Sequence, residues 1–194
     1  MSDLEFHFDF RSPYSYLAHG QLGGLGTPVR YKPMDVLEVM KIVGNTPTTI
    51  VCQAKSRYAN KDLGRWAQRY GTALSPNPAM RQIDGRRLLR AVLAADKAGQ
   101  ADAAVAALFP ALWAGATDLA SAEAVSRALA AGGVTLSPEA LDDPALDAEL
   151  TAASQAAAAR DVFGAPTFLI GDDMYFGNDR LDFLRERLAK EPAQ

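Results

Sequence analysis

The chain has 194 residues, 48% of them hydrophobic, and this length suits one domain, alone or with a large insertion. Its formal net charge of −3 at pH 7 argues against the basic surface of a nucleic-acid-binding protein. Cys52 is the only cysteine and the two histidines fall in different predicted elements, so we expect neither an intramolecular disulfide nor a His/Cys metal site. No apolar stretch approaches the roughly 20 residues that span a bilayer, and the acidic start of the chain lacks the order of a signal peptide, so we expect a cytoplasmic protein without membrane contact.

The first part of the chain predicts a βαβ unit. Apolar residues alternate along 4–10, as in a strand with one buried face. Ser12 and Pro13 then begin a helix over 13–19, because serine is a preferred N-cap residue and proline suits the first helical position. Several glycines end this helix, and residues 29–33 form a second strand, parallel to the first in a right-handed unit.

A long helical region follows, and we find no convincing strand between residues 35 and 160. Its segments are rich in alanine, which has the highest helix propensity. Breaks fall at Gly132-Gly133 and at Ser137-Pro138. The predicted helices are 35–43, 56–70, 88–97, 101–113, 121–131 and 145–160.

The C-terminal segment returns to sheet and ends in a helix. Residues 166–170 and 174–176 predict two strands joined by a tight turn. The last helix runs over 180–188 with its apolar positions on one face, and Asn178 or Asp179 is available as its N-cap residue.

The order of these elements predicts the fold class. A βαβ unit is followed by a helical block and then by a ββα unit, which is the order of an α/β, thioredoxin-like fold with a large all-helical insertion. The thioredoxin-like domain is then discontinuous, comprising residues 1–34 and 161–194, and the inserted helical domain comprises residues 35–160.

Ser12 lies at the C-terminal end of a predicted strand and at the start of a helix. Open α/β sheets bind ligands at such places, and a helix N-terminus presents free N–H groups and partial positive charge that suit an anion. Ser12 is either a plain N-cap residue or a functional hydroxyl. Ser12 and Ser15 stand where thioredoxin-like proteins carry Cys-x-x-Cys. Because serines replace both thiols at these positions, we do not expect a thiol–disulfide oxidoreductase.

Several short sequence segments of the chain resemble those of one protein family. In this respect the chain is similar to the 2-hydroxychromene-2-carboxylate isomerases, glutathione-dependent enzymes of aromatic degradation that are related to the kappa-class glutathione transferases. The segments span nearly the whole chain in the expected order. They are residues 8–15, 44–47, 55–58 with 62–67, 163–168 and 176–181.

The resemblance implies a glutathione site around Ser12. Ser12 is then the residue that faces the glutathione sulfur, and its hydroxyl donates to the thiolate, which is the nucleophile. Ala165-Pro166 resembles the cis-proline site of thioredoxin folds, where the cysteinyl part of glutathione pairs with Ala165 as an added strand does. The alternative for Pro166 is a trans proline that opens a strand.

The resemblance also implies contacts with the ends of glutathione. Asp179 then accepts from the ammonium group and Asn178 binds the γ-glutamyl carboxylate, whereas the alternative for both is a plain helix cap. Lys55 reaches a glutathione carboxylate and Asn45 reaches glutathione or the substrate, although a helical lysine is often only solvated.

Further residues are candidates for substrate contact or for packing. Arg11, Tyr14 and Tyr16 are predicted to bind or stack on an aromatic acid substrate. Trp66 is interpreted as a core residue. His19 falls late in the first helix, where a positive charge favours the helix C-terminus.

The resemblance therefore implies a glutathione-dependent cis–trans isomerase that interconverts 2-hydroxychromene-2-carboxylate and trans-o-hydroxybenzylidenepyruvate. One alternative is a kappa-like glutathione transferase, which releases the adduct and consumes glutathione. Another is a non-catalytic thioredoxin-fold protein that binds peptides. The expected partners are a small aromatic acid and glutathione, with no nucleic acid and no membrane, and the resemblance allows a homodimer.

Overall fold

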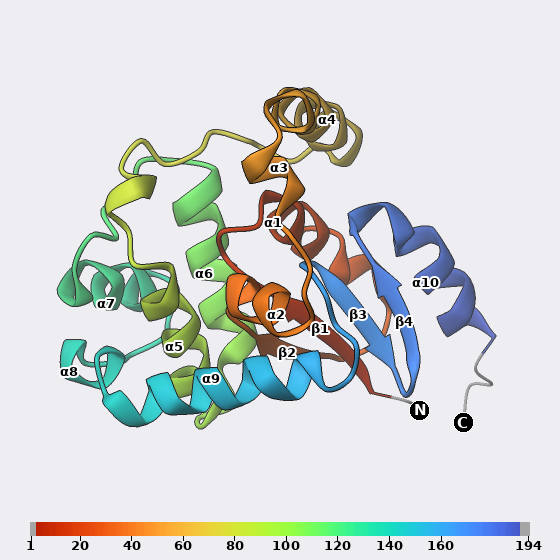
Figure 1. Cartoon of the computed structure of the whole chain (residues 1–194). Coiled ribbons are helices and arrows are strands. Elements are labelled where there is room, and N and C mark those ends of the chain that lie inside the picture. The colour runs from red at the N-terminus through yellow and green to blue at the C-terminus, as the bar shows by residue number, and fades with distance from the viewer. Residues whose placement is uncertain (1–2, 191–194) are drawn as a thin grey trace.

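The computed structural model describes residues 3–190 and contains a mixed four-stranded sheet in the order β2-β1-β3-β4 (Figure 1). β1 (Leu4–Phe8) pairs parallel with β2 (Val29–Pro33) and antiparallel with β3 (Thr167–Ile170), and β3 pairs antiparallel with β4 (Asp173–Phe176). The predicted βαβ unit and the predicted C-terminal hairpin are confirmed.

Helices fill the chain between β2 and β3, as predicted. None of the helices within residues 3–190 has the length and apolar composition that crossing a bilayer requires. The α-helices are α1 (Pro13–His19), α2 (Val36–Ile42), α3 (Thr48–Val51), α4 (Gln53–Tyr70), α5 (Gly85–Asp96), α6 (Ala101–Trp113), α7 (Ala122–Ala131), α8 (Pro138–Leu141), α9 (Pro144–Ala158) and α10 (Leu181–Ala189), and the 3₁₀ helices are η1 (Leu22–Leu25), η2 (Met80–Gln82) and η3 (Asn178–Arg180).

The first strand is shorter than predicted. It ends at Phe8 and not at residue 10, because the chain turns at Asp9. The carboxylate of Asp9 accepts from the N–H of Arg11 at 2.8 Å, and its carbonyl accepts from the N–H of Ser12 at 3.0 Å. The turn therefore presents Ser12 at the end of the strand, as the N-cap residue of α1.

Two helices begin earlier than predicted. α5 begins at Gly85, because the carboxylate of Asp84 accepts from the N–H of Arg86 at 2.9 Å and caps the helix. α4 begins at Gln53, directly after the short helix α3. α3 was not predicted, since four residues are too few to show a helical period. For α8 the pattern Ser137-Pro138 indicated the helix start, and Ser137 is its N-cap residue, but its short extent was not predicted.

The predicted cap of the last helix is wrong. α10 begins at Leu181 after Arg180, and no side chain caps it. Asn178 and Asp179 lie in η3 instead. Their side chains are engaged elsewhere: the amide of Asn178 lies 3.4 Å from the Tyr70 hydroxyl and the Asp179 carboxylate pairs with Arg180, so neither is available as a cap.

The two faces of the sheet are covered by different helices (Figure 1). On one face, Leu169 of β3 packs in a cluster with Val39 of α2 and Ala157 of α9. On the other face, a larger core joins the sheet to α1, α6 and α10. Its centre is a stack of rings in which Phe6 lies 5.1 Å from Phe8 and 5.2 Å from Phe168, between centroids.

One core runs from the sheet into the inserted helices. Phe109 of α6 contacts Phe8 and Phe10, with ring centroids 5.6 and 4.7 Å apart. Trp113 at the end of α6 donates from Nε1 to the carbonyl of Phe10 at 2.7 Å. The helical block is thus packed directly against the start of α1, while the domain boundaries at residues 34/35 and 160/161 remain a prediction.

His19 is not a charged helix-end residue, and that interpretation is wrong. Its ring packs between Tyr31 and Phe109, with centroids 6.0 and 5.3 Å away. Burial lowers the pKa of His19 to about 4, because desolvation disfavours the charged imidazole. His19 is therefore neutral at pH 7, and its partly buried ring packs against core aromatic side chains. Trp66 is also partly buried and packs against the core as interpreted.

We expect His19 to weaken the fold as the pH falls. Between pH 6.5 and 4 the unfolded chain binds a proton at His19 that the folded chain does not, so stability rises with pH across this window. The contribution is on the order of 3 kcal/mol. Urea unfolding of His19→Leu should show a flatter pH dependence over this range than the parent chain; identical slopes would contradict the burial of a neutral imidazole.

Candidate active site

β1 and β4 end, and β3 begins, at the same end of the sheet, and the predicted site residues lie next to these strand ends. His7, next to last in β1, pairs with Thr167 at the start of β3, and Thr167 pairs with Phe176 at the end of β4. The turn before α1, the Ala165-Pro166 segment and the start of η3 therefore meet there. In Figure 1 this is the end of the sheet nearest α3 and α4.

Ser12 and Ala165-Pro166 are in direct contact. The hydroxyl of Ser12 donates to the carbonyl of Ala165 at 3.1 Å, and Ser12 Oγ accepts from the N–H of Ser15 at 3.2 Å. The Ala165–Pro166 peptide bond is cis, as the resemblance implied. Ser12 is only partly buried, so its hydroxyl is both a helix cap and a donor at the surface of the site.

Ser15 plays a different part from Ser12. It is fully buried, and its Oγ is a buried side-chain atom that has no hydrogen-bond partner within residues 3–190. The second serine of the Ser-x-x-Ser pattern therefore lies inside the protein. Ser12 is the one that reaches the surface of the candidate site.

Tyr14 ties the first helix to α4. Its hydroxyl donates to the carboxylate of Asp62 at 3.1 Å. Burial, together with the Asp62 carboxylate, raises the pKa of Tyr14 above its ordinary value. The hydroxyl is thus a neutral donor that is engaged with α4, and the contact of Tyr14 with a substrate stays a prediction. Tyr16 is buried, and its hydroxyl donates to the carbonyl of Ala73 at 2.7 Å, so it packs in the core.

Arg11 is held by two carboxylates. Its Nε donates to Asp9 at 3.0 Å and its Nη2 pairs with both Asp9 and Asp35, the latter at 2.6 Å. Asp9 is fully buried, whereas the Arg11 side chain is 33% exposed. Although burial opposes it, pairing with Asp9 and Asp35 raises the pKa of Arg11. These ion pairs give Arg11 a structural role, and its predicted contact with a substrate stays a prediction.

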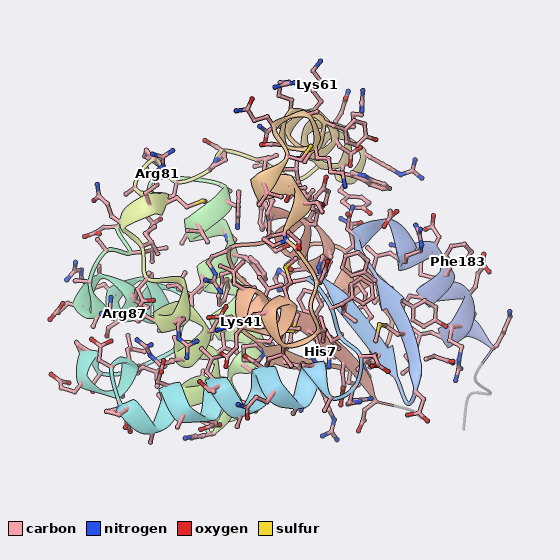
Figure 2. The ribbon with its side chains drawn as sticks, viewed as in Figure 1. His7, Lys41, Lys61, Arg81, Arg87 and Phe183 are labelled. Carbon is pink, nitrogen blue, oxygen red and sulfur yellow. The ribbon has the colours of Figure 1, made fainter. Side chains whose placement is uncertain are left out.

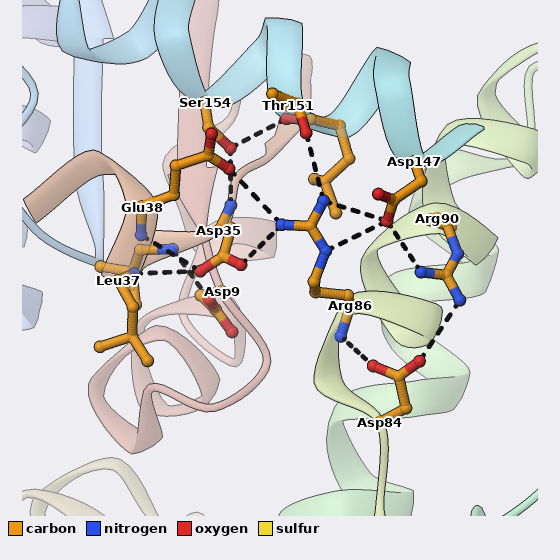
Figure 3. Close-up of polar contacts among 12 residues, drawn as sticks. Asp9, Asp35, Leu37, Glu38, Asp84, Arg86, Arg90, Asp147, Thr151 and Ser154 are labelled. Carbon is orange, nitrogen blue, oxygen red and sulfur yellow. Dashed lines mark hydrogen bonds and ion pairs between the residues drawn. The ribbon is translucent and has the colours of Figure 1, made fainter. Parts of the chain in front are cut away.

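Asp35 extends this cluster into the helical region (Figure 3). It caps α2 by accepting from the N–H groups of Leu37 and Glu38, and its other oxygen pairs with Arg86 of α5 at 2.9 Å. Arg86 also pairs with Asp147 of α9 at 3.0 Å. These ion pairs were not predicted, because their partners are far apart in the chain.

Asn45 lies at the same end of the sheet. Its side-chain amide donates to the carbonyl of Phe163 at 2.8 Å, two residues before Ala165. Lys55 is exposed in the first turn of α4, and no side-chain partner is found for it within residues 3–190. The structure therefore joins Asn45, but not Lys55, to the segment that contacts Ser12.

Asn178 and Asp179 lie beside a small pocket of about 170 Å³. The hydroxyl of Tyr70 donates to the carbonyl of the buried Asn178 at 2.9 Å, which fixes η3 to α4. The Asp179 side chain is 46% exposed. Arg69 and Arg185 also line the pocket; they were missed because arginines on exposed helix faces carry no distinguishing pattern in a sequence.

A larger pocket lies elsewhere. It has a volume of about 530 Å³, runs along the edge strand β2 and is lined in part by Val29, Tyr31 and Lys32. None of the predicted site residues lines it. Size alone therefore does not mark the candidate site, which is defined by the polar groups around Ser12.

Comparisons with known proteins identify the family of this chain. Residues 3–189 match the family described as DSBA-like thioredoxin domain. A 2-hydroxychromene-2-carboxylate isomerase of Pseudomonas putida is 34% identical over 194 residues, which cover 96% of this chain and 94% of that protein. The chain belongs to the 2-hydroxychromene-2-carboxylate isomerase family.

Other members of this isomerase family support the assignment. The Sphingobium xenophagum protein of the same name is 34% identical over 194 residues, which cover 95% of this chain and 97% of that protein. A solved structure of a selenomethionine 2-hydroxychromene-2-carboxylate isomerase matches with a TM-score of 0.81 at 34% identity, covering 96% of this chain and 94% of that one. The resemblance and the thioredoxin-like fold with its helical insertion are thereby confirmed.

Proposed function

We propose that this protein is a glutathione-dependent isomerase that interconverts 2-hydroxychromene-2-carboxylate and trans-o-hydroxybenzylidenepyruvate. The observation that carries the proposal is the Ser12 hydroxyl beside Ala165-Pro166, at the start of α1, in a chain whose relatives bear this enzyme's name. The function itself is inferred from the site, because folds of this class serve many functions.

The residues at this end of the sheet fit the chemistry of glutathione. Glutathione carries a thiol, an ammonium group and two carboxylates. Ser12 offers a hydroxyl to the sulfur and Asp179 offers an acceptor to the ammonium group. The exposed Lys55 and the guanidinium groups of Arg69 and Arg185 are positive groups for the carboxylates.

Glutathione, when bound, would supply a thiolate that adds reversibly to the conjugated double bond of the ring-opened substrate, so that rotation about this bond becomes possible. Ser12 contributes a hydrogen bond that favours the ionised thiol, and the N-terminus of α1 adds favourable potential. To do so, the Ser12 hydroxyl turns from the Ala165 carbonyl, 3.1 Å away, toward the sulfur.

A positive group is also needed for the substrate carboxylate and for the charge that develops on the keto oxygen. Arg11 and Lys55 are the two predicted candidates. Arg11 already forms ion pairs with Asp9 and Asp35, whereas within residues 3–190 Lys55 forms no ion pair with a carboxylate. We therefore assign this role to Lys55, with Asn45 as a neutral donor beside it.

We expect many substrate turnovers for each glutathione molecule. In an absorbance assay of chromene-carboxylate isomerisation, a catalytic amount of glutathione should sustain the full reaction and be recovered unchanged. Stoichiometric loss of glutathione would instead indicate the kappa-like transferase, since the two readings differ only in whether the adduct is released. No binding at millimolar glutathione would contradict both and leave the peptide-binding alternative.

The compartment follows from the same proposal. A glutathione-dependent enzyme needs the cytoplasmic glutathione pool, so we propose a cytoplasmic location. The homodimer allowed by the resemblance is a separate question, which sedimentation answers in the experiment described below.

A further inference from the structure

The phenylalanines of this chain fall into two groups. Of the eight phenylalanines, five are fully buried, namely Phe6, Phe8, Phe10, Phe109 and Phe168. The other three are exposed: Phe163 by 37%, Phe176 by 42% and Phe183 by 56%. Phe183 projects from α10 (Figure 2), whereas Phe163 and Phe176 pack together with ring centroids 4.5 Å apart.

This exposed pair flanks the segment that contacts Ser12. The carbonyl of Phe163 accepts from Asn45 at 2.8 Å. Phe176 is the last residue of β4, and the next N–H, that of Gly177, donates to the carbonyl of Pro166 at 2.9 Å. Both phenylalanines are therefore fixed by their backbones to the two sides of Ala165-Pro166.

Gly164 lets the Phe176 ring lie directly against this segment. A Cβ atom at Gly164 would lie only 2.8 Å from Cε2 of Phe176, so no larger residue fits under the ring. Gly164 immediately precedes Ala165, whose carbonyl accepts from the Ser12 hydroxyl. The ring is thus packed against the backbone of the site and against Phe163, and 42% of Phe176 remains exposed.

We propose that the Phe163–Phe176 pair binds the aryl ring of the substrate. This inference rests on the proposed function, in which the substrate is an aromatic α-keto acid. Binding sites of this kind combine apolar walls with a few polar groups that fix orientation. Here two exposed rings flank the Ala165-Pro166 segment, and backbone carbonyls on and next to this segment accept from the Asn45 amide and the Ser12 hydroxyl. Aromatic rings pack favourably in offset or edge-to-face geometry, and the exposed parts of both rings are available for such a contact.

The test compares Phe176→Ala and Phe163→Ala with Phe183→Ala, the matched loss of an exposed ring outside the site. At saturating glutathione, we expect KM for chromene-carboxylate isomerisation to rise about tenfold in Phe176→Ala, while the Kd of glutathione measured by calorimetry stays at the parent value. Phe183→Ala should behave as the parent. Equal KM values in Phe176→Ala and Phe183→Ala would overturn the proposal.

A second measurement separates this subsite from the proposed function. If the parent chain does not isomerise the chromene, the proposed function fails, and the subsite is then tested by calorimetric titration with 2-hydroxycinnamate. Binding that is lost in Phe176→Ala supports the subsite, and absence of binding to the parent overturns it. Phe176→Leu, which keeps an apolar side chain against Gly164, replaces the alanine variant if that variant does not fold.

The same variants test whether a second copy of this chain, and not the substrate, covers the Phe163–Phe176 pair. If sedimentation shows that Phe163→Ala and Phe176→Ala dissociate a dimer while KM is unchanged, the aromatic pair is an interface between copies, and the proposal is overturned. A raised KM without a change in the oligomeric state supports it.

Discussion

Replacing Ser12 by alanine is expected to lower kcat for chromene-carboxylate isomerisation about 100-fold, the scale seen when one positioned donor to an anion is removed. Ser12 holds its hydroxyl at the start of α1, 3.1 Å from the Ala165 carbonyl. Loss of this donor should raise the thiol pKa of bound glutathione, because the ionised form loses a hydrogen bond. The pH profile of kcat and the thiolate absorbance of the complex measure both effects.

The chain offers two controls for this variant. Ser15→Ala makes the same change three positions along the helix, at a buried hydroxyl without a partner in the described part of the chain, and should leave kcat unchanged. Ser12→Ala also removes a helix cap, which costs about 1 kcal/mol, whereas glycine at this position costs only a few tenths. An equal loss of activity in Ser12→Gly assigns the effect to the hydroxyl; parental activity in either variant removes Ser12 from the mechanism.

The elements of the fold were predictable because their signals are local. Ser12-Pro13 begins α1 as expected, since a cap and the first helical position are read from adjacent residues. Where the prediction failed, a tertiary contact prevailed over a local preference. Asn178 has the side chain of a cap, but it is turned toward Tyr70 of α4, a partner that no local pattern indicates.

The candidate site was predicted in its types of residue but not in its partners. The resemblance identified Ser12 and Ala165, and their hydrogen bond joins residues that are 153 positions apart. Arg11 was predicted as a substrate contact, and its ion pair with Asp35, 24 positions away, was not predicted, because the sequence does not show that the two residues lie within reach. Contacts of this kind depend on how the strands and helices pack, which spacing along the chain does not encode.

Replacing Arg11 by methionine is expected to lower the free energy of unfolding by about 3 kcal/mol, because a buried carboxylate would lose its charged partner. The Asp9 side chain is 0% exposed and receives hydrogen bonds from both Nε and Nη2 of Arg11. Methionine keeps the apolar stem but not the charge. For a chain of this size, the melting temperature measured by circular dichroism should fall by roughly 10 °C.

Lowering the pH should reduce the difference in the free energy of unfolding between the parent and Arg11→Met. Burial raises the pKa of Asp35, but Arg11 and Arg86 outweigh it and hold this pKa below its ordinary value of 3.8. A depressed carboxyl pKa contributes stability that is present above the unfolded value and is lost as the pH falls through the folded one. The stability gap between the parent and Arg11→Met should therefore shrink below about pH 3.8, and a constant gap would contradict the ion pair.

Gly85→Ala tests how Arg11 is held between Asp9 and Asp35, through the contact of its side chain with α5. A Cβ atom at Gly85, the first residue of α5, would lie 2.8 Å from Cδ and 2.9 Å from Cγ of Arg11, so the stem would have to move while its guanidinium is held by Asp9 and Asp35. Alanine favours a helix over glycine by about 1 kcal/mol, so any destabilisation comes from this contact. We expect Gly85→Ala to destabilise the parent by chemical denaturation but not the Arg11→Met background, where the more flexible methionine can yield. Equal effects in both backgrounds would show that the two residues act independently, and α5 would then have no part in holding Arg11 beside Ser12.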